Sequence, residues 1–196
     1  MTHIETSRLT IRNFEPDDWR GLQALAVQQQ TSEYGAYDHR WPTSEEELRG
    51  VAAWFSEGDG FLAVCLRDAG AFIGLIAINR KGGEDAAEYG LGYRFDERYH
   101  GKGYATEACR AALNHVFGEL GAALVSTGTA AANEASCRLL RRLGLRKTGE
   151  SVGSFVKDAD GRPIEFVGYT FCITREEWLA GQGPGASPPS ASGPRM

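Results

Sequence analysis

Two glycines, Gly101 and Gly103, stand between a segment with the pattern of a strand and a segment with the pattern of a helix. Glycine lets the backbone turn tightly and lets a ligand approach the backbone N–H groups. Since a helix begins directly behind the glycines, the same N–H groups and the helix dipole favour an anion. The segment therefore predicts a site for a phosphate-bearing ligand, although a tight turn that binds nothing has the same pattern.

The residues around these glycines disfavour two common nucleotide-binding motifs. A Walker A loop needs Ser or Thr directly after Gly-Lys, and here Gly103 follows Lys102. A dinucleotide fingerprint needs a third glycine where Thr106 stands, an early strand–helix–strand unit and an acidic residue about 20 positions further on. Neither pattern is complete, so a different phosphate-bearing ligand is expected.

Length and charge limit the class of protein. The chain has 196 residues, with 21 Lys and Arg against 26 Asp and Glu, and a formal charge of −5. A domain of this length buries about 70% of the surface that its unfolded chain exposes, so stability requires neither a disulfide nor a metal. The acidic balance disfavours nucleic acid as a partner. The longest apolar run, about eight residues at 71–78, is too short for a membrane span. With no signal-peptide pattern at the start, we expect a cytoplasmic protein without a membrane partner.

The four cysteines predict buried thiols, and no metal site is predicted. They stand at positions 65, 109, 137 and 172, at least 28 residues apart. Zinc knuckles and redox pairs need two cysteines within about four residues of each other. Each cysteine lies in an apolar segment, which suits a small buried side chain in a reducing compartment.

The composition changes near the end of the chain. Residues 181–196 contain four Gly, four Pro and three Ser, a composition that buries too little apolar surface to offset the entropy lost on ordering. We therefore predict one folded domain over residues 1–180 and a disordered tail over residues 181–196. No internal repeat or interior linker divides the domain.

Apolar periodicity predicts seven strands and four helices. Pro16 opens the first helix, which places Trp19 and Leu22 on its apolar face, and Thr43 with Glu46 fits a capping box for the second. The strands are expected at 9–12, 61–66, 71–78, 86–95, 124–129, 146–156 and 165–173, and the last two helices at 105–117 and 133–143. The strand–helix–strand stretch from 86 to 129 implies one parallel pair.

The pattern Arg98-x-x-Gly101-x-Gly103 between strand and helix resembles the acetyl-coenzyme A pyrophosphate loop of the GNAT N-acetyltransferases. Residues 5–12, Glu-Thr-Ser-Arg-Leu-Thr-Ile-Arg, resemble the opening of the branch that contains the RimJ and RimL ribosomal-protein N-terminal acetyltransferases. The segments 92–93, 101–108, 133–136, 143–149 and 169–178 extend the likeness to this branch over about 175 residues.

The resemblance implies an α/β (α+β) GNAT fold, with a mixed, mostly antiparallel sheet of about seven strands flanked by four helices. In this fold one parallel strand pair splays apart, the pantetheine arm lies in the gap, and the loop binds the pyrophosphate. The cofactor-binding residues implied for acetyl-coenzyme A are Tyr93, Arg94, Phe95, Arg98, Gly101, Lys102, Gly103, Tyr104, Ala105, Asn133 and Ser136. For Arg98 and Lys102, a solvated charge is the alternative.

Ser136 is the candidate general acid. From position alone, Asn133 suits a helix N-cap and Ser136 an ordinary residue of the first turn. The resemblance implies in addition that Asn133 bonds the cofactor or a water, and that the Ser136 hydroxyl lies near the sulfur, where it can protonate the departing thiolate. Some GNAT members use a tyrosine for this step, and no tyrosine stands between Tyr104 and Tyr169.

Glu88 is the candidate general base, directly or through a water. An α-amine with a pKa near 8 is roughly 10% neutral at pH 7, whereas lysine is only about 0.04% neutral, so an N-terminal acceptor needs little help. Many relatives carry the acid at the position of Gly90, which shares a strand face with Glu88 in the absence of a bulge. The alternative for Glu88 is an exposed residue at a strand end.

An aromatic cluster precedes the second helix. Tyr34, Tyr37, His39 and Trp41 lie within eight residues, and rings with polar tips suit the entrance to an amine or peptide site. Packing of a long loop is the alternative. The resemblance implies acetyl transfer to a primary amine, either a protein N-terminal α-amine or a small molecule, by direct attack and in a possible homodimer. The alternative function is a non-catalytic acyl-coenzyme A sensor or interaction module.

Overall fold

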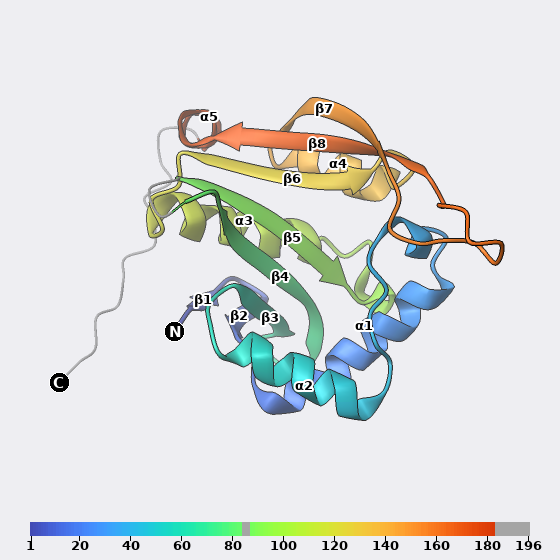
Figure 1. Ribbon diagram of the computed structural model, residues 1–196. Coiled ribbons are helices and arrows are strands. Elements are labelled where there is room, and N and C mark those ends of the chain that lie inside the picture. The colour runs from blue at the N-terminus through green and yellow to red at the C-terminus, as the bar shows by residue number, and fades with distance from the viewer. Residues whose placement is uncertain (84–86, 183–196) are drawn as a thin grey trace.

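The computed structural model describes residues 1–83 and 87–182, which form a single eight-stranded sheet with helices on both faces (Figure 1). The strands are β1 (His3–Glu5), β2 (Leu9–Asn13), β3 (Phe61–Leu66), β4 (Phe72–Lys81), β5 (Glu88–Phe95), β6 (Leu124–Ala130), β7 (Arg146–Gly153) and β8 (Phe166–Thr174). The helices are α1 (Trp19–Thr31), α2 (Glu45–Ser56), α3 (Tyr104–Gly118), α4 (Glu134–Arg142) and α5 (Arg175–Gly181). Three short 3-10 turns are η1 (Pro16–Asp18), η2 (Gly35–Tyr37) and η3 (Glu97–Tyr99).

The strand order is β1-β2-β3-β4-β5-β6-β8-β7, and every neighbouring pair except β5–β6 is antiparallel. The predicted mixed sheet with one parallel pair is confirmed. The described residues add one strand and one helix to the predicted seven and four: β1 is only three residues long, and α5 has two turns. Elements this short give almost no periodic signal.

Three predicted boundaries need comment. The N-cap of α2 is Ser44, whose Oγ accepts the Glu47 N–H, so the predicted capping box of Thr43 with Glu46 was wrong. Ala86, where a strand was expected to begin, lies outside the described residues. The predicted tail starts at Gly181, which ends α5, and its residues from 183 onward lie outside the described part of the chain.

The helices cover different parts of the sheet because side chains alternate along its central strands. Leu62 and Val64 of β3 join the large core on the α3 side, whereas Ala63 and Cys65 pack under α1 and α2. Both faces of β3 are therefore buried, which explains its unbroken apolar sequence. The cluster under α1 and α2 draws its strand residues from β3 and β4, and the same face of the sheet continues through Gly90 and Gly92 of β5 to Ser126 and Gly128 of β6.

The parallel pair separates soon after it forms. β5 and β6 pair only from Glu88 to Gly90, opposite Leu124 to Ser126, although both strands continue beyond these residues (Figure 1). β4 remains paired with β5 along the whole of β5 without a register shift. The backbone edge of β5 from Leu91 onward consequently faces the gap and has no strand partner there among the described residues.

The four thiols are free; Cys65, Cys109 and Cys137 are buried and Cys172 is half-buried. Burial raises the pKa of Cys65 to about 11, so this thiol is protonated at neutral pH. In the part of the chain that is described, no helix has the length and apolar character needed to cross a membrane, and no group of three or more His, Cys, Asp and Glu residues could hold a metal ion.

Candidate functional site

A cleft of about 1460 Å³ connects the glycine loop with the opposite face of the sheet through the gap between β5 and β6. Its lining includes Gly103 at the start of α3, Tyr93 of β5, Thr129 of β6 and Ser136 of α4. Most single-ligand pockets occupy about 300–1,000 Å³, so this cleft has room for a long ligand and a second molecule.

The loop at one end of the cleft has the geometry of an anion site. Gly101 and Gly103 have φ angles of +73° and +81°, in the left-handed region that favours glycine. Gly103 is the N-cap of α3 and contributes no side-chain cap, and the first helical hydrogen bond runs from Glu107 N–H to the Gly103 carbonyl. The N–H groups from Gly103 to Thr106 precede that bond, so they can donate to a ligand.

Arg98 and Lys102 fold back against the protein. Arg98 Nε lies 3.0 Å from each carboxylate oxygen of Asp96, whose side chain also accepts a hydrogen bond from Gln28 at 3.0 Å. Lys102 Nζ donates to the Arg98 carbonyl and lies over the Tyr99 ring. Neither Arg98 nor Lys102 lines the cleft, so their side chains shape the loop from behind.

A second set of contacts holds the loop from the amino-terminal side. The Glu107 carboxylate accepts hydrogen bonds from Thr6 Oγ1 at 2.6 Å, Ser7 Oγ at 3.0 Å, and Arg8 N and Nε at 3.0 and 2.7 Å. Arg8 Nη1 also donates to the Lys102 carbonyl at 2.9 Å. Burial alone would raise the pKa of Glu107, but these donors outweigh it and the pKa is lowered.

Sequence reasoning missed this contact between the β1–β2 turn and α3. The donors and the carboxylate are about 100 residues apart in the chain, and no local pattern joins them. A partial signal was available, because the segment that contains Arg8 had already been singled out by its resemblance to a family motif.

Ser136 and Tyr93 form a polar pair in the wall of the cleft. The Tyr93 hydroxyl lies 2.7 Å from Ser136 Oγ, and Asn133 Oδ1 accepts the Ser136 N–H at 3.0 Å. Asn133 is therefore the N-cap of α4, as predicted from its position. Burial raises the pKa of Tyr93 well above its usual value, although the bond to Ser136 opposes this, so the phenol keeps its proton near neutral pH.

The sequence predicted Tyr93 as a cofactor-binding residue and did not indicate that its hydroxyl pairs with Ser136. The side chain points to the same face of β5 as the buried Leu91 and Phe95, and a phenol buried in such a place needs a hydrogen-bond partner. This alternation was visible in the sequence, but the identity of the partner was not.

Glu88 lies outside the cleft lining, near the start of β5. Its Oε1 accepts a hydrogen bond from Ser126 Oγ at 2.7 Å, and Lys81 Nζ donates to the same Ser126 oxygen at 2.7 Å. A Cβ atom on Gly90 would lie 3.0 Å from Lys81 Cε. The lysine stem therefore covers the space that a carboxylate at position 90 would need.

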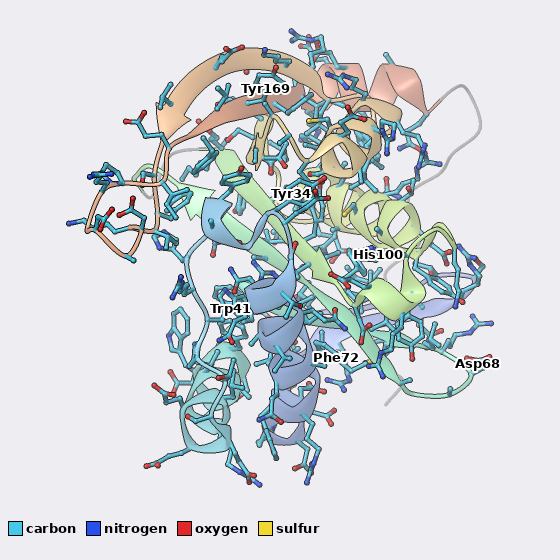
Figure 2. All side chains as sticks on the ribbon, turned by 90° about the vertical axis from the view of Figure 1, so that its right-hand side faces the viewer. Tyr34, Trp41, Asp68, Phe72, His100 and Tyr169 are labelled. Atoms are coloured by element: carbon cyan, nitrogen blue, oxygen red, sulfur yellow. The ribbon has the colours of Figure 1, made fainter. Side chains whose placement is uncertain are left out.

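The aromatic cluster predicted for the acceptor divides into two parts. Tyr34 and Tyr37 line the cleft, whereas His39 packs behind it against Phe155, with 4.4 Å between the ring centroids. Trp41 contacts Phe55 of α2 and lies under the Arg94 guanidinium, outside the cleft lining. Figure 2 shows Tyr34 at the end of α1 and Trp41 in the loop that leads to α2.

Most of the predicted residues meet in one cleft. Those that line it are Tyr93, Arg94, Phe95, Gly101, Gly103, Tyr104, Ala105, Asn133, Ser136, Tyr34 and Tyr37. Those that do not are Glu88, Arg98, Lys102, His39 and Trp41. The structure adds Arg142 of α4, which lines the cleft beside the loop and donates to Thr106 Oγ1 at 3.2 Å.

Comparison with known proteins gives consistent similarities. A family model described as an acetyltransferase (GNAT) domain matches residues 8–146. The chain is 32% identical over 181 residues to the uncharacterized N-acetyltransferase YnaD of Bacillus subtilis (strain 168), a match that covers 90% of this chain and 99% of YnaD.

Two solved structures share the fold. An acetyltransferase (GNAT family) from Bacillus anthracis superposes with a TM-score of 0.76 at 24% identity, covering 89% of this chain and 99% of that one. Spermidine N-acetyltransferase from Vibrio cholerae, solved with coenzyme A and spermine, gives a TM-score of 0.73 at 19% identity and the same coverage. Because the family model spans more than half of the chain, the protein belongs to the GNAT acetyltransferases, a family of acyltransferase enzymes that use acetyl-coenzyme A.

Proposed function

We propose that the protein is an N-acetyltransferase that transfers the acetyl group of acetyl-coenzyme A to a primary amine by direct attack. The observation that carries this proposal is the single cleft that joins the glycine loop to the opposite face of the sheet through the gap between β5 and β6. The sequence motifs resemble those of the RimJ and RimL branch, which supports our proposal that the acceptor is an N-terminal α-amine or a small-molecule amine.

The residues at the loop fit the cofactor. The N–H groups from Gly103 to Thr106 would hold the diphosphate, and Arg142 beside them adds a positive charge. The unpaired edge of β5 from Leu91 to Phe95 offers backbone groups to an extended amide-bearing arm. When bound, acetyl-coenzyme A supplies an acetyl group that is activated as a thioester.

Ser136 is our candidate to stabilise or protonate a departing thiolate. Its hydroxyl lies at the start of α4, where the helix dipole favours negative charge, and Tyr93 fixes its orientation. We expect Ser136→Ala to lower kcat by about tenfold or more while the Kd for acetyl-coenzyme A changes little. An unchanged kcat would remove Ser136 from the chemistry and leave it a helix residue.

Glu88 is our candidate base, acting through water because it lies outside the cleft lining. Since an alkylamine of the lysine type is far less often neutral than an α-amine, loss of a base should affect it more. We expect Glu88→Gln to reduce turnover more for a lysine-like acceptor than for an α-amine acceptor. Equal losses for both acceptors would exclude Glu88 as the base.

The transferase proposal is tested by release of free thiol from acetyl-coenzyme A with a panel of amines. We expect release that depends on the amine, and we expect Gly103→Glu to abolish cofactor binding because it adds a negative charge at the N-cap of α3, beside the N–H groups that would hold the diphosphate. Gly103→Ala is the matched control, since it shares the cost of a left-handed φ without adding a charge. Tight binding measured by calorimetry, with no thiol release for any amine, would instead indicate a non-catalytic sensor.

A further inference from the structure

We infer that the acceptor is an amine that bears one positive charge in solution and carries an aromatic group. This inference rests on the proposed function and names the substrate class of the same cleft. It is drawn from the part of the cleft away from the glycine loop, where a row of aromatic rings faces a floor of glycines.

The rings, which we call the ring wall, are Tyr37, His39, Phe155 and Phe166. Tyr37 and Phe166 have centroids 5.2 Å apart, Phe166 and Phe155 are stacked at 5.5 Å, and Phe155 and His39 are 4.4 Å apart. The wall joins the loop after α1 to the connection between β7 and β8, two segments more than 100 residues apart. Phe155 is 48% exposed and lines the cleft, so the wall presents ring surface to whatever enters.

The floor consists of Gly92, Gly128 and Gly168 on three adjacent strands. Gly92 and Gly128 point to the same face as Gly90 and Ser126, the last residues of the parallel pairing, and Gly168 lies opposite Ala130 on that face. All three glycines line the cleft. A Cβ atom on Gly128 would approach nothing closer than a backbone oxygen at 3.8 Å, so the space above it is empty. With only small side chains beside these glycines, Thr170 opposite Gly128 and Ala130 opposite Gly168, the floor next to the wall of rings suits a flat group better than a bulky one.

Arg94 and Asp38 form a neutral ion pair next to the ring wall. Arg94 donates to the Asp38 carboxylate and lies over the Trp41 ring with 4.9 Å to its centroid. Asp38, half-exposed, stands between Tyr37 and His39 of the ring wall, and Glu33 after α1 and Glu97 in η3 also line the cleft. A polyamine carries several positive charges, and the neutral Arg94–Asp38 pair offers no net negative charge to bind them. A monoamine loses its single charge before it attacks, and its aromatic group gains contact with the rings.

The test measures kcat/KM for phenethylamine, hexylamine and spermidine with the full chain. We expect phenethylamine to exceed hexylamine by about tenfold and spermidine by more. Phe155→Ala should remove most of the preference for phenethylamine through a higher KM, and Gly128→Val should block phenethylamine while acetyl-coenzyme A still binds. Val152→Ala is the matched control, because Val152 is 66% exposed on β7 and does not line the cleft.

The possible outcomes separate the two proposals. Equal kcat/KM values for phenethylamine and hexylamine, or a preference for spermidine, would overturn the inference and leave the transferase assignment intact. A preference that survives Phe155→Ala would overturn the role of the ring wall. The absence of thiol release with every amine would overturn the proposed function, and the acceptor class with it.

Discussion

Asp96, which is only 2% exposed, binds the Arg98 side chain just before the glycine loop. The Arg98 side chain, and next the Gln28 amide, donate to its carboxylate and hold its pKa at about 2, below the ordinary value of 3.8. Because the folded pKa is depressed, the stabilisation is fully present above about pH 4 and is lost as the pH falls from 4 toward 2.

The shift at Asp96 predicts a pH-dependent cost of mutation. Lowering the pKa of this carboxyl from 3.8 to about 2 on folding corresponds to about 2–3 kcal/mol of folding stability at neutral pH. Asp96→Asn should therefore lower the free energy of unfolding by about 2 kcal/mol at pH 7, and the difference from the wild type should shrink as the pH falls below 4. Urea denaturation of both proteins at several pH values measures this difference in the free energy of unfolding. A difference that is constant from pH 7 to pH 3 would contradict the assigned ion pair.

At the scale of elements, the contact between the β1–β2 turn and α3 supports the glycine loop. Arg8 joins the Glu107 carboxylate, 2.6 Å away, to the Lys102 carbonyl, so the turn fixes the loop on which α3 begins. Loss of the Arg8 side chain removes the positive charge that faces Glu107 near the anion site and frees the Lys102 carbonyl. Both effects place uncompensated negative charge closer to the bound phosphate, so both should weaken its binding.

We expect Arg8→Gln to raise the Kd for acetyl-coenzyme A by about tenfold, with a smaller change in kcat at saturating cofactor. Isothermal titration calorimetry measures the first quantity and initial rates measure the second. Arg110→Gln is the control. Arg110 is exposed on α3 and does not line the cleft, so the substitution removes one positive charge without touching the Arg8 contacts. If both variants weakened binding equally, net charge and not the Arg8 contacts would be responsible.

At the scale of the whole molecule, the shape of the cleft predicts the kinetic mechanism. The loop and the ring wall lie in one continuous space on opposite sides of the β5–β6 gap, so cofactor and acceptor can be bound together. None of the four cysteines lines the described cleft, which disfavours an acyl-cysteine intermediate. Initial rates measured against both substrates should give intersecting lines in double-reciprocal plots. Parallel lines would indicate a covalent intermediate and contradict direct attack.

The strand and helix order followed from the sequence because periodicity and capping depend on neighbouring residues. The paired Gly101 and Gly103 predicted a tight turn before a helix, and their positive φ angles confirm the backbone that was expected. Asn133 predicted the start of α4 for the same reason. The strand–helix–strand order predicted the parallel pair, and the family motifs added that this pair splays apart, which no local pattern contains.

The sequence by itself determined the order of the elements, the loop and the first residues of α3 and α4, since each depends on backbone preferences within a few positions, and its family motifs indicated the fold class. Only the tertiary structure decided which side chains face the cleft. It turned Arg98 and Lys102 back toward the protein, placed Tyr93 against Ser136, and brought Phe166 to Tyr37. Such partners come from segments far apart in the chain, so their meeting depends on how the whole sheet and its helices pack and on no local pattern.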